Sequence, residues 1–141
     1  LIASENDRVF NYENRIYRSF MTDQLLLKQL MTILFDNAIK YTEEDGKIEF
    51  VVHATDRHLY LTVTDNGIGI SAADKKKIFD RFYRVDKART RQKGGFGLGL
   101  SLAKQIVDAL RGTITVKDNK PRGTIFEVKI AIQSPSKRKN K

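Results

Sequence analysis

The order of the expected helices and strands predicts an α+β fold, a two-layer α/β sandwich in which a mixed, mostly antiparallel sheet packs on three helices. Two observations carry this prediction. Apolar residues recur at helical spacing in separate stretches, and they alternate with polar residues in the stretches between. Most of the alternating stretches come in pairs joined by short turns, which favours antiparallel neighbours.

The helices are placed by apolar spacing and by signals at their ends. Asp23 is the expected N-cap of the first helix, and Ser71 begins a capping-box-like stretch in which Asp replaces the usual Glu. Gly112 is the expected C-terminal stop of the last helix. The three helices are expected at residues 24–41, at residues 71–82 and from Gly97 or Leu98 to Leu110.

The strands are placed by the alternation of apolar and polar residues. They are expected at residues 47–54, 59–65, 113–117 and 124–132. Turns are expected at residues 44–46, 56–57 and 118–123. The first twenty residues are expected to form short strands and turns, with buried points at Val9, Phe10, Ile16 and Tyr17.

The composition suits one folded domain and excludes several classes of protein. Hydrophobic residues make up 40% of the 141 residues, which is enough for a core. The chain has no cysteine, so disulfides, zinc–thiolate sites and cysteine nucleophiles are excluded. No apolar run approaches the roughly 20 residues that span a bilayer. We therefore expect a soluble piece of a longer protein, with residues 1–133 as its domain.

The net charge of +9 gathers largely in two segments. One segment, residues 81–93, lies just before a glycine-rich stretch, and the other is the end of the chain. We expect residues 134–141 to be a basic, disordered tail. The chain has no recognisable nucleic-acid-binding motif, so a basic nucleic-acid binder is the weakest alternative.

Asp65 is the first candidate site residue. Leu59, Leu61 and Val63 point to one face of their strand, and Asp65 falls on the same apolar side. A carboxylate there needs a partner, and a ligand amine such as that of adenine would supply one. The other interpretation is that the strand ends at Thr64 and that Asp65 simply opens an Asp-Asn-Gly turn. The spacing leaves both interpretations open.

Asn37 is the second candidate, because it lies on the apolar stripe of its helix. Its amide is either satisfied by the backbone within the core or acts as an oxygen ligand to Mg²⁺. One turn later, Lys40 is either solvated or faces a phosphate. Tyr41 either belongs to the core or packs near a base.

Two glycine-rich stretches complete the candidates. In residues 67–70 two glycines alternate with two isoleucines, which either lets the backbone approach a flat ligand or forms a plain turn. Residues 94–100 precede a helix, whose first N–H groups and dipole favour phosphate. This second stretch matches neither the dinucleotide fingerprint nor the Walker A loop.

Five blocks together resemble the catalytic, ATP-binding domain of sensor histidine kinases, in the superfamily that also holds gyrase B, Hsp90 and MutL. The blocks occur in the family's order over roughly residues 20–132. They resemble the N box (29–42), the G1 box (65–70), the F box (78–84), the G2 box (95–100) and the glycine-threonine box (123–126). This resemblance implies the Bergerat-type ATP-binding fold and binding of ATP with Mg²⁺.

The resemblance also implies a role for each matching residue. Asp65 is expected to accept a hydrogen bond from the adenine N6, while Asn37 holds Mg²⁺ as the metal ligand and Lys40 contacts phosphate. The basic segment from Arg84 to Lys93 is expected to be the ATP lid. The full ATP-binding set that the resemblance implies is Asn37, Lys40, Tyr41, Asp65, Gly67, Gly69, Ile70, Tyr83, Arg84, Gly95, Gly97, Leu98, Gly99, Leu100 and Thr124.

Two features depart from a complete kinase. Ile33 stands where many N boxes carry a second asparagine, which puts a second polar contact from this helix in doubt. His53 and His58 lie at strand ends and are expected to be surface residues. The resemblance therefore implies that the acceptor histidine lies on a dimerisation domain upstream in the same protein, and that this piece has no catalytic residue beyond those that position ATP.

The function expected from the resemblance is thus the ATP-binding half of a histidine autokinase in two-component signalling. The implied partners are the dimerisation domain and a response regulator, and the implied location is the cytoplasmic part of a membrane-anchored sensor. The piece itself is expected to be monomeric and not to bind nucleic acid. The alternatives are an ATPase or serine kinase of the same superfamily, and a nucleotide-sensing or partner-binding module that has lost catalysis.

Overall fold

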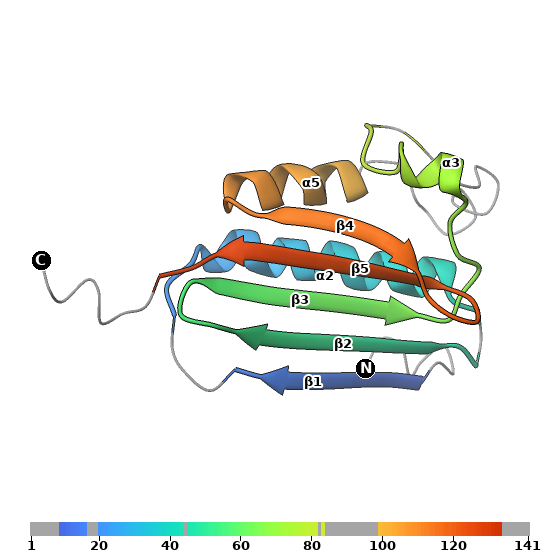
Figure 1. Cartoon of the computed structure of the whole chain (residues 1–141), viewed down its shortest axis with the longest axis horizontal. Coiled ribbons are helices and arrows are strands. Elements are labelled where there is room, and N and C mark those ends of the chain that lie inside the picture. The colour runs from blue at the N-terminus through green and yellow to red at the C-terminus, as the bar shows by residue number, and fades with distance from the viewer. Residues whose placement is uncertain (1–8, 17–19, 44, 82, 84–98, 134–141) are drawn as a thin grey trace, which may run out of the picture.

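A five-stranded mixed sheet forms one layer of the molecule, and helices cover one of its faces (Figure 1). The structure is a computed structural model that describes residues 9–16, 20–43, 45–81, 83 and 99–133. The strands lie in the order β1-β2-β3-β5-β4, in which β1 pairs parallel to β2 and the other neighbours are antiparallel. They are β1 (Val9–Arg15), β2 (Lys47–Ala54), β3 (His58–Asp65), β4 (Thr113–Asp118) and β5 (Thr124–Ala131).

Helices α2 (Gln24–Tyr41) and α5 (Gly99–Ala109) pack against each other and against the sheet, and the short helix α3 (Ala72–Lys75) lies near the end where β3 finishes (Figure 1). The predicted two-layer α+β fold is therefore confirmed. None of the helices within the described residues is long and apolar enough to cross a membrane.

The first helix follows the sequence signals closely. The Asp23 side chain accepts a hydrogen bond of 3.0 Å from the backbone N–H of Leu26, as an N-cap does. One stripe of α2 is buried, and burying a leucine side chain of this stripe contributes about 1.5–3 kcal/mol. The buried members of this stripe are Leu30, Leu34, Ala38 and Tyr41.

The core lies between the sheet and the two long helices. β3 alternates along its whole length, with every second side chain buried. Phe50 and Phe126 are the largest fully buried side chains, and Phe79 meets Phe126 edge-on at 6.4 Å between ring centroids. The strand pattern therefore predicts correctly which face of each central strand is buried.

The second helix is shorter than predicted. Ser71 caps α3 by accepting from the backbone N–H of Asp74 at 3.1 Å, but the helix ends at Lys75 and does not continue to residue 82. Tight turns follow the helix. Lys77 N–H donates to the Asp74 carbonyl, and the next backbone hydrogen bonds along the chain also join residues three positions apart. These turns bury Ile78 in the core.

The stop of the last helix also differs from the prediction. The left-handed residue is Arg111, with φ of 58°, and the N–H of Gly112 donates to the carbonyl of Val107 in a Schellman motif. Gly112 is needed for a different reason. A Cβ at Gly112 would lie 2.1 Å from the carbonyl oxygen of Lys129, so the adjoining strand leaves no room for a side chain.

Within the first twenty residues, the part that the structure describes forms one strand, β1, over Val9–Arg15. Because β1 is an edge strand, Val9 is 47% exposed, and the prediction that it is buried is wrong. Phe10 is half-buried and stacks on Phe35 at 4.5 Å, and Ile16 is also half-buried. Tyr17 and the predicted tail at residues 134–141 lie outside the described residues.

Candidate nucleotide-binding site

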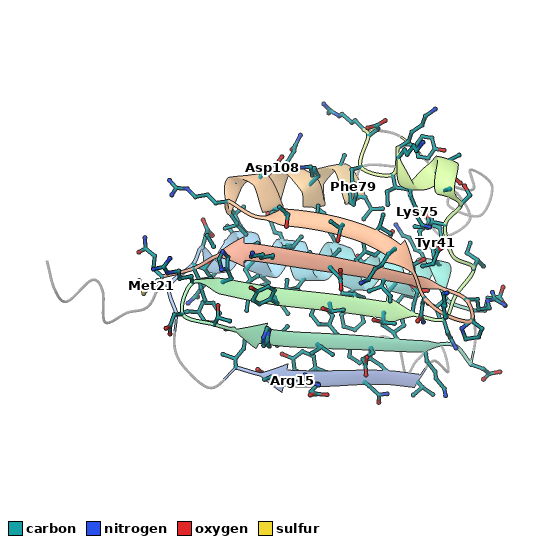
Figure 2. All side chains as sticks on the ribbon, viewed as in Figure 1. Arg15, Met21, Tyr41, Lys75, Phe79 and Asp108 are labelled. Atoms are coloured by element: carbon teal, nitrogen blue, oxygen red, sulfur yellow. The ribbon has the colours of Figure 1, made fainter. Side chains whose placement is uncertain are left out.

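The candidate residues gather where β3 ends, β5 begins and α2 finishes. Asp65 and Thr124 face each other in the β3–β5 register. The chain that leaves β3 passes the last turn of α2, where Ile68 N–H donates to the carbonyl of Tyr41 at 3.1 Å. Figure 2 shows Tyr41 and Lys75 at this end of the molecule. Strand pairing therefore brings together motifs that are far apart in the sequence.

Asp65 is buried and belongs to β3, so the interpretation that the strand ends at Thr64 is wrong. Its side chain is 3% exposed, and Oδ1 accepts a hydrogen bond of 2.8 Å from Gly67 N–H. Burial raises the pKa of Asp65 to about 6, against the opposing effect of backbone N–H donors from Gly67 and Thr124. Asp65 therefore both ends a buried strand and opens the Asp-Asn-Gly turn.

Thr124 carries an unsatisfied polar atom beside this carboxylate. Its side chain is 2% exposed, and Oγ1 is the one buried side-chain polar atom without a hydrogen-bond partner in the described part of the chain. A buried hydroxyl without a partner is unfavourable by about 1–3 kcal/mol. The Asp65–Thr124 pair thus offers an acceptor and a donor to a polar molecule that enters the site.

The two glycines after Asp65 are required for different reasons. A Cβ at Gly67 would lie 1.9 Å from the carbonyl oxygen of Tyr41, so a side chain would force the loop away from α2. Gly69 has φ of 77°, a conformation that disfavours other residues. Ile70 is buried and anchors the loop in the core. The loop is therefore built for close backbone approach and is not a plain surface turn.

The candidate site residues of α2 differ in how deeply they are buried. Tyr41 is buried, while Asn37 and Lys40 are half-buried. Among the described residues, no hydrogen bond engages the Asn37 amide, so the core-asparagine interpretation is not supported. Ile33 lies near the start of α5, with its Cγ2 3.6 Å from where a Cβ on Gly99 would stand. An apolar residue at position 33 therefore suits this helix–helix contact.

The F and G2 boxes are described in part. The Tyr83 hydroxyl donates to the carboxylate of Asp74, which ties the end of the F box to α3 and holds the pKa of Asp74 below its ordinary value. Gly99 begins α5, and Leu100 packs against the core. Arg84, Gly95, Gly97 and Leu98 lie outside the described residues. The described residues contain no group of three or more acidic or histidine side chains that could hold a metal ion.

The sequence reasoning missed the turn between β4 and β5, which it treated as a simple reversal. Asn119 Nδ2 donates to the carbonyl of Asp65 at 2.9 Å, and Arg122 Nε donates to the carbonyl of Gly67 at 2.8 Å. The turn and the loop also flank an open hollow of about 550 Å³. No local pattern predicts these contacts, since asparagine is an ordinary turn residue and both partner carbonyls lie more than fifty residues away.

Known proteins share both the sequence and the fold. Residues 22–134 match the family described as "Histidine kinase-, DNA gyrase B-, and HSP90-like ATPase". Sensor protein CiaH of Streptococcus pneumoniae serotype 4 is 83% identical over 139 residues, which cover 99% of this chain and 31% of that protein.

Solved structures agree with this match. The mycobacterial sensor histidine kinase MprB is 25% identical with a TM-score of 0.77, covering 94% of this chain and 88% of that one. The nucleotide-free catalytic domain of histidine kinase ThkA is 26% identical with a TM-score of 0.75, covering 95% and 86%. The chain therefore belongs to the histidine kinase-, DNA gyrase B- and HSP90-like ATPase family, as an ATP-binding catalytic domain of the sensor histidine kinase type.

Proposed function

We propose that this domain binds Mg·ATP and positions its γ-phosphate for transfer to a histidine on a separate domain. The observation that carries the proposal is the buried pair of Asp65 and Thr124. The edge of adenine offers an N6 amine that donates and a neighbouring ring nitrogen that accepts. These groups match an acceptor carboxylate and a donor hydroxyl, with water completing part of the contact.

The phosphates would lie between α2 and the start of α5. Asn37 would hold Mg²⁺ through its amide oxygen, and Lys40 would contact phosphate oxygens. Bound Mg²⁺ would neutralise phosphate charge, and few protein ligands suffice because phosphates and water complete its coordination. The N–H groups at Gly99 and Leu100 begin a helix of eleven residues, whose dipole favours anions. Five further residues are included in the proposed site only because they match the family's motifs: Tyr83, Arg84, Gly95, Gly97 and Leu98.

The acceptor histidine would come from outside this chain. His53 is exposed and half-buried His58 begins β3, and both rings lie against Tyr60, at 4.8 and 6.1 Å between centroids. Neither histidine belongs to a helix. We therefore propose transfer to a dimerisation domain upstream in the same protein, followed by a response regulator, in the cytoplasmic part of a membrane-anchored sensor. This domain would act as a monomer without nucleic acid, by positioning and charge neutralisation.

Nucleotide titration tests the adenine contact. We expect the 141-residue chain to bind ADP with Mg²⁺ in calorimetry, and Asp65→Asn to lose at least about tenfold in affinity, because an amide N–H can face the N6 donor. Asp108→Asn is the matched control, since Asp108 lies on α5 toward the opposite end of the molecule (Figure 2). Equal affinities for the wild type and Asp65→Asn would remove Asp65 from the adenine site.

Phosphotransfer tests the kinase activity. A longer chain that carries the upstream histidine should form acid-labile phosphohistidine from labelled ATP. A second candidate is a module that binds nucleotide without catalysis, and the apolar packing of Ile33 beside Gly99 motivates it. ADP binding without phosphohistidine in the longer chain would favour this second candidate.

A further inference from the structure

The turn between β4 and β5, residues 118–123, holds the loop that carries the proposed adenine contact. Asn119 donates to the carbonyl of Asp65 at 2.9 Å, and Arg122 donates to the carbonyl of Gly67 at 2.8 Å. These carbonyls belong to the Asp65–Asn66 and Gly67–Ile68 peptide groups, so the loop is held from the same turn on both sides of the Asn66–Gly67 peptide group. We call residues 65–69 the adenine loop and residues 118–123 the clamp turn.

The backbone of the adenine loop has its partners on three sides. Gly67 N–H donates to the Asp65 carboxylate at 2.8 Å, and Ile68 N–H donates to Tyr41 in α2. The Asn66 side chain accepts from Lys47 N–H in β2 at 2.7 Å. On the remaining side, side chains of the clamp turn donate hydrogen bonds to the carbonyls of Asp65 and Gly67. These contacts leave the loop little freedom, because buried backbone groups require their partners.

The clamp turn is itself built to keep its shape. Asn119 N–H donates to the carbonyl of Gly123 at 3.0 Å, and the Asn119 side-chain oxygen accepts from Lys120 N–H at 2.9 Å. Asp118 forms an ion pair with Lys75 of α3 at 2.5 Å. One Asn119 side chain thus bonds both its own turn and the adenine loop, and the turn is also tied to the helix after that loop.

The position of the Asp65 carboxylate depends on the backbone that the clamp turn holds. Its Oδ1 is oriented by Gly67 N–H, which lies in the peptide group between the two that the clamp turn holds, so a shift of this backbone moves the carboxylate against Thr124 on the neighbouring strand. A displacement of about 1 Å can lower the rate of a reaction between positioned groups by about a hundredfold, and a hydrogen bond to a ligand depends on the same distances. The contacts of Asn119 and Arg122 therefore act on the base without touching it.

We propose that Asn119 and Arg122 are positioning residues that set the preference of the site for adenine by holding the Asp65 carboxylate in place. This inference rests on the proposed binding of ATP. It predicts an effect on recognition of the 6-amino group in particular, because the rest of the nucleotide contacts other elements.

The test compares two ligands in the 141-residue chain: ADP with Mg²⁺, and the ADP analogue that carries hydrogen in place of the 6-amino group. In the double variant Asn119→Ala/Arg122→Ala we expect ADP affinity to fall about tenfold, which corresponds to one or two hydrogen bonds. Affinity for the analogue should change less than about twofold, since the analogue has no amine for Asp65 to accept. The single variant Arg122→Lys keeps one side-chain donor at this position. It should therefore keep most of the wild-type preference for ADP over the analogue.

Lys120→Ala is the matched control, because Lys120 lies in the same turn and contacts Asn119 through its backbone. It should leave both affinities and the melting temperature unchanged. Equal losses for ADP and the analogue in the double variant would mean a purely structural turn and would overturn the inference, and so would an unchanged ADP affinity. A wild-type chain that binds ADP and the analogue equally well, or an Asp65→Asn variant that keeps the full preference for ADP, would overturn the proposed adenine contact itself.

Discussion

The two hairpin turns of the sheet use their side chains in different ways. In the turn between β2 and β3, the Thr55 hydroxyl accepts from His58 N–H at 3.1 Å, and Thr55 N–H donates to the His58 carbonyl at 2.9 Å. These bonds span three residues. In the clamp turn, the Asn119 and Arg122 side chains reach carbonyls 54 and 55 residues away. The comparison teaches that a turn stabilised by its own side chains reverses the chain, while one whose side chains reach outward positions a distant loop.

Substitution of Gly123 should break the clamp turn most severely. A Cβ at this position would lie 1.9 Å from the carbonyl oxygen of Asp65, and Gly123 has φ of 112°. We expect Gly123→Ala to lower the free energy of unfolding by about 4 kcal/mol, through overlap and backbone strain together. Chemical denaturation measures this loss.

Gly69→Ala is the control for backbone strain alone. Gly69 has φ of 77°, but the atoms nearest to an added Cβ would be 3.6 Å away or farther. We expect a loss of only about 1–2 kcal/mol from the left-handed conformation. Similar losses for the two variants would contradict the view that the clamp turn presses directly on the adenine loop.

The pH dependence of stability should sharpen the account of the buried carboxylate. The pKa of Asp65 rises from an ordinary 3.8 to about 6 in the folded protein, so the folded state favours the protonated form. The stabilisation from this shift is fully present below about pH 4 and is lost as pH rises through about 6. A shift of about two pKa units corresponds to about 3 kcal/mol.

Asp65→Asn isolates this effect, because asparagine does not titrate. Between pH 4 and pH 7, the unfolding free energy of this variant should rise relative to the wild type by up to about 3 kcal/mol. Denaturation series at several pH values measure the difference. A difference that stays constant with pH would mean that Asp65 is not desolvated, and the burial argument would fail.

Thr55→Ala should have the smallest effect and should confine it to stability. The hydroxyl makes bonds within its own turn, so we expect a loss of about 1 kcal/mol in unfolding free energy. ADP affinity should stay unchanged in calorimetry, in contrast to the double variant in the clamp turn. A comparable loss of ADP affinity in Thr55→Ala would erase the distinction between the two turns.

Much of the fold follows from local sequence. The apolar stripe from Leu30 to Tyr41 and the Asp23 cap determine α2, and the alternation along β3 places Asp65 on the buried face. The order of the five blocks indicates a nucleotide-binding domain of the histidine kinase type, and family membership confirms that interpretation. Such features can be read from the sequence because they depend on spacings of a few residues.

The short α3 and the Schellman stop at Arg111 escaped prediction, because tertiary packing decides where a marginal helix ends. The exposure of Val9 escaped it too, since alternation cannot tell an edge strand from a central one.

The sequence by itself determined helix α2, strands β2 to β5, the face on which Asp65 lies and the family. The tertiary structure alone decided that Thr124 stands beside Asp65 with an unsatisfied hydroxyl, and that Asn119 and Arg122 hold the adenine loop. The physical reason is range. Periodicity and capping act between neighbours along the chain, whereas these contacts join residues more than fifty positions apart, which meet only after β3 and β5 have paired.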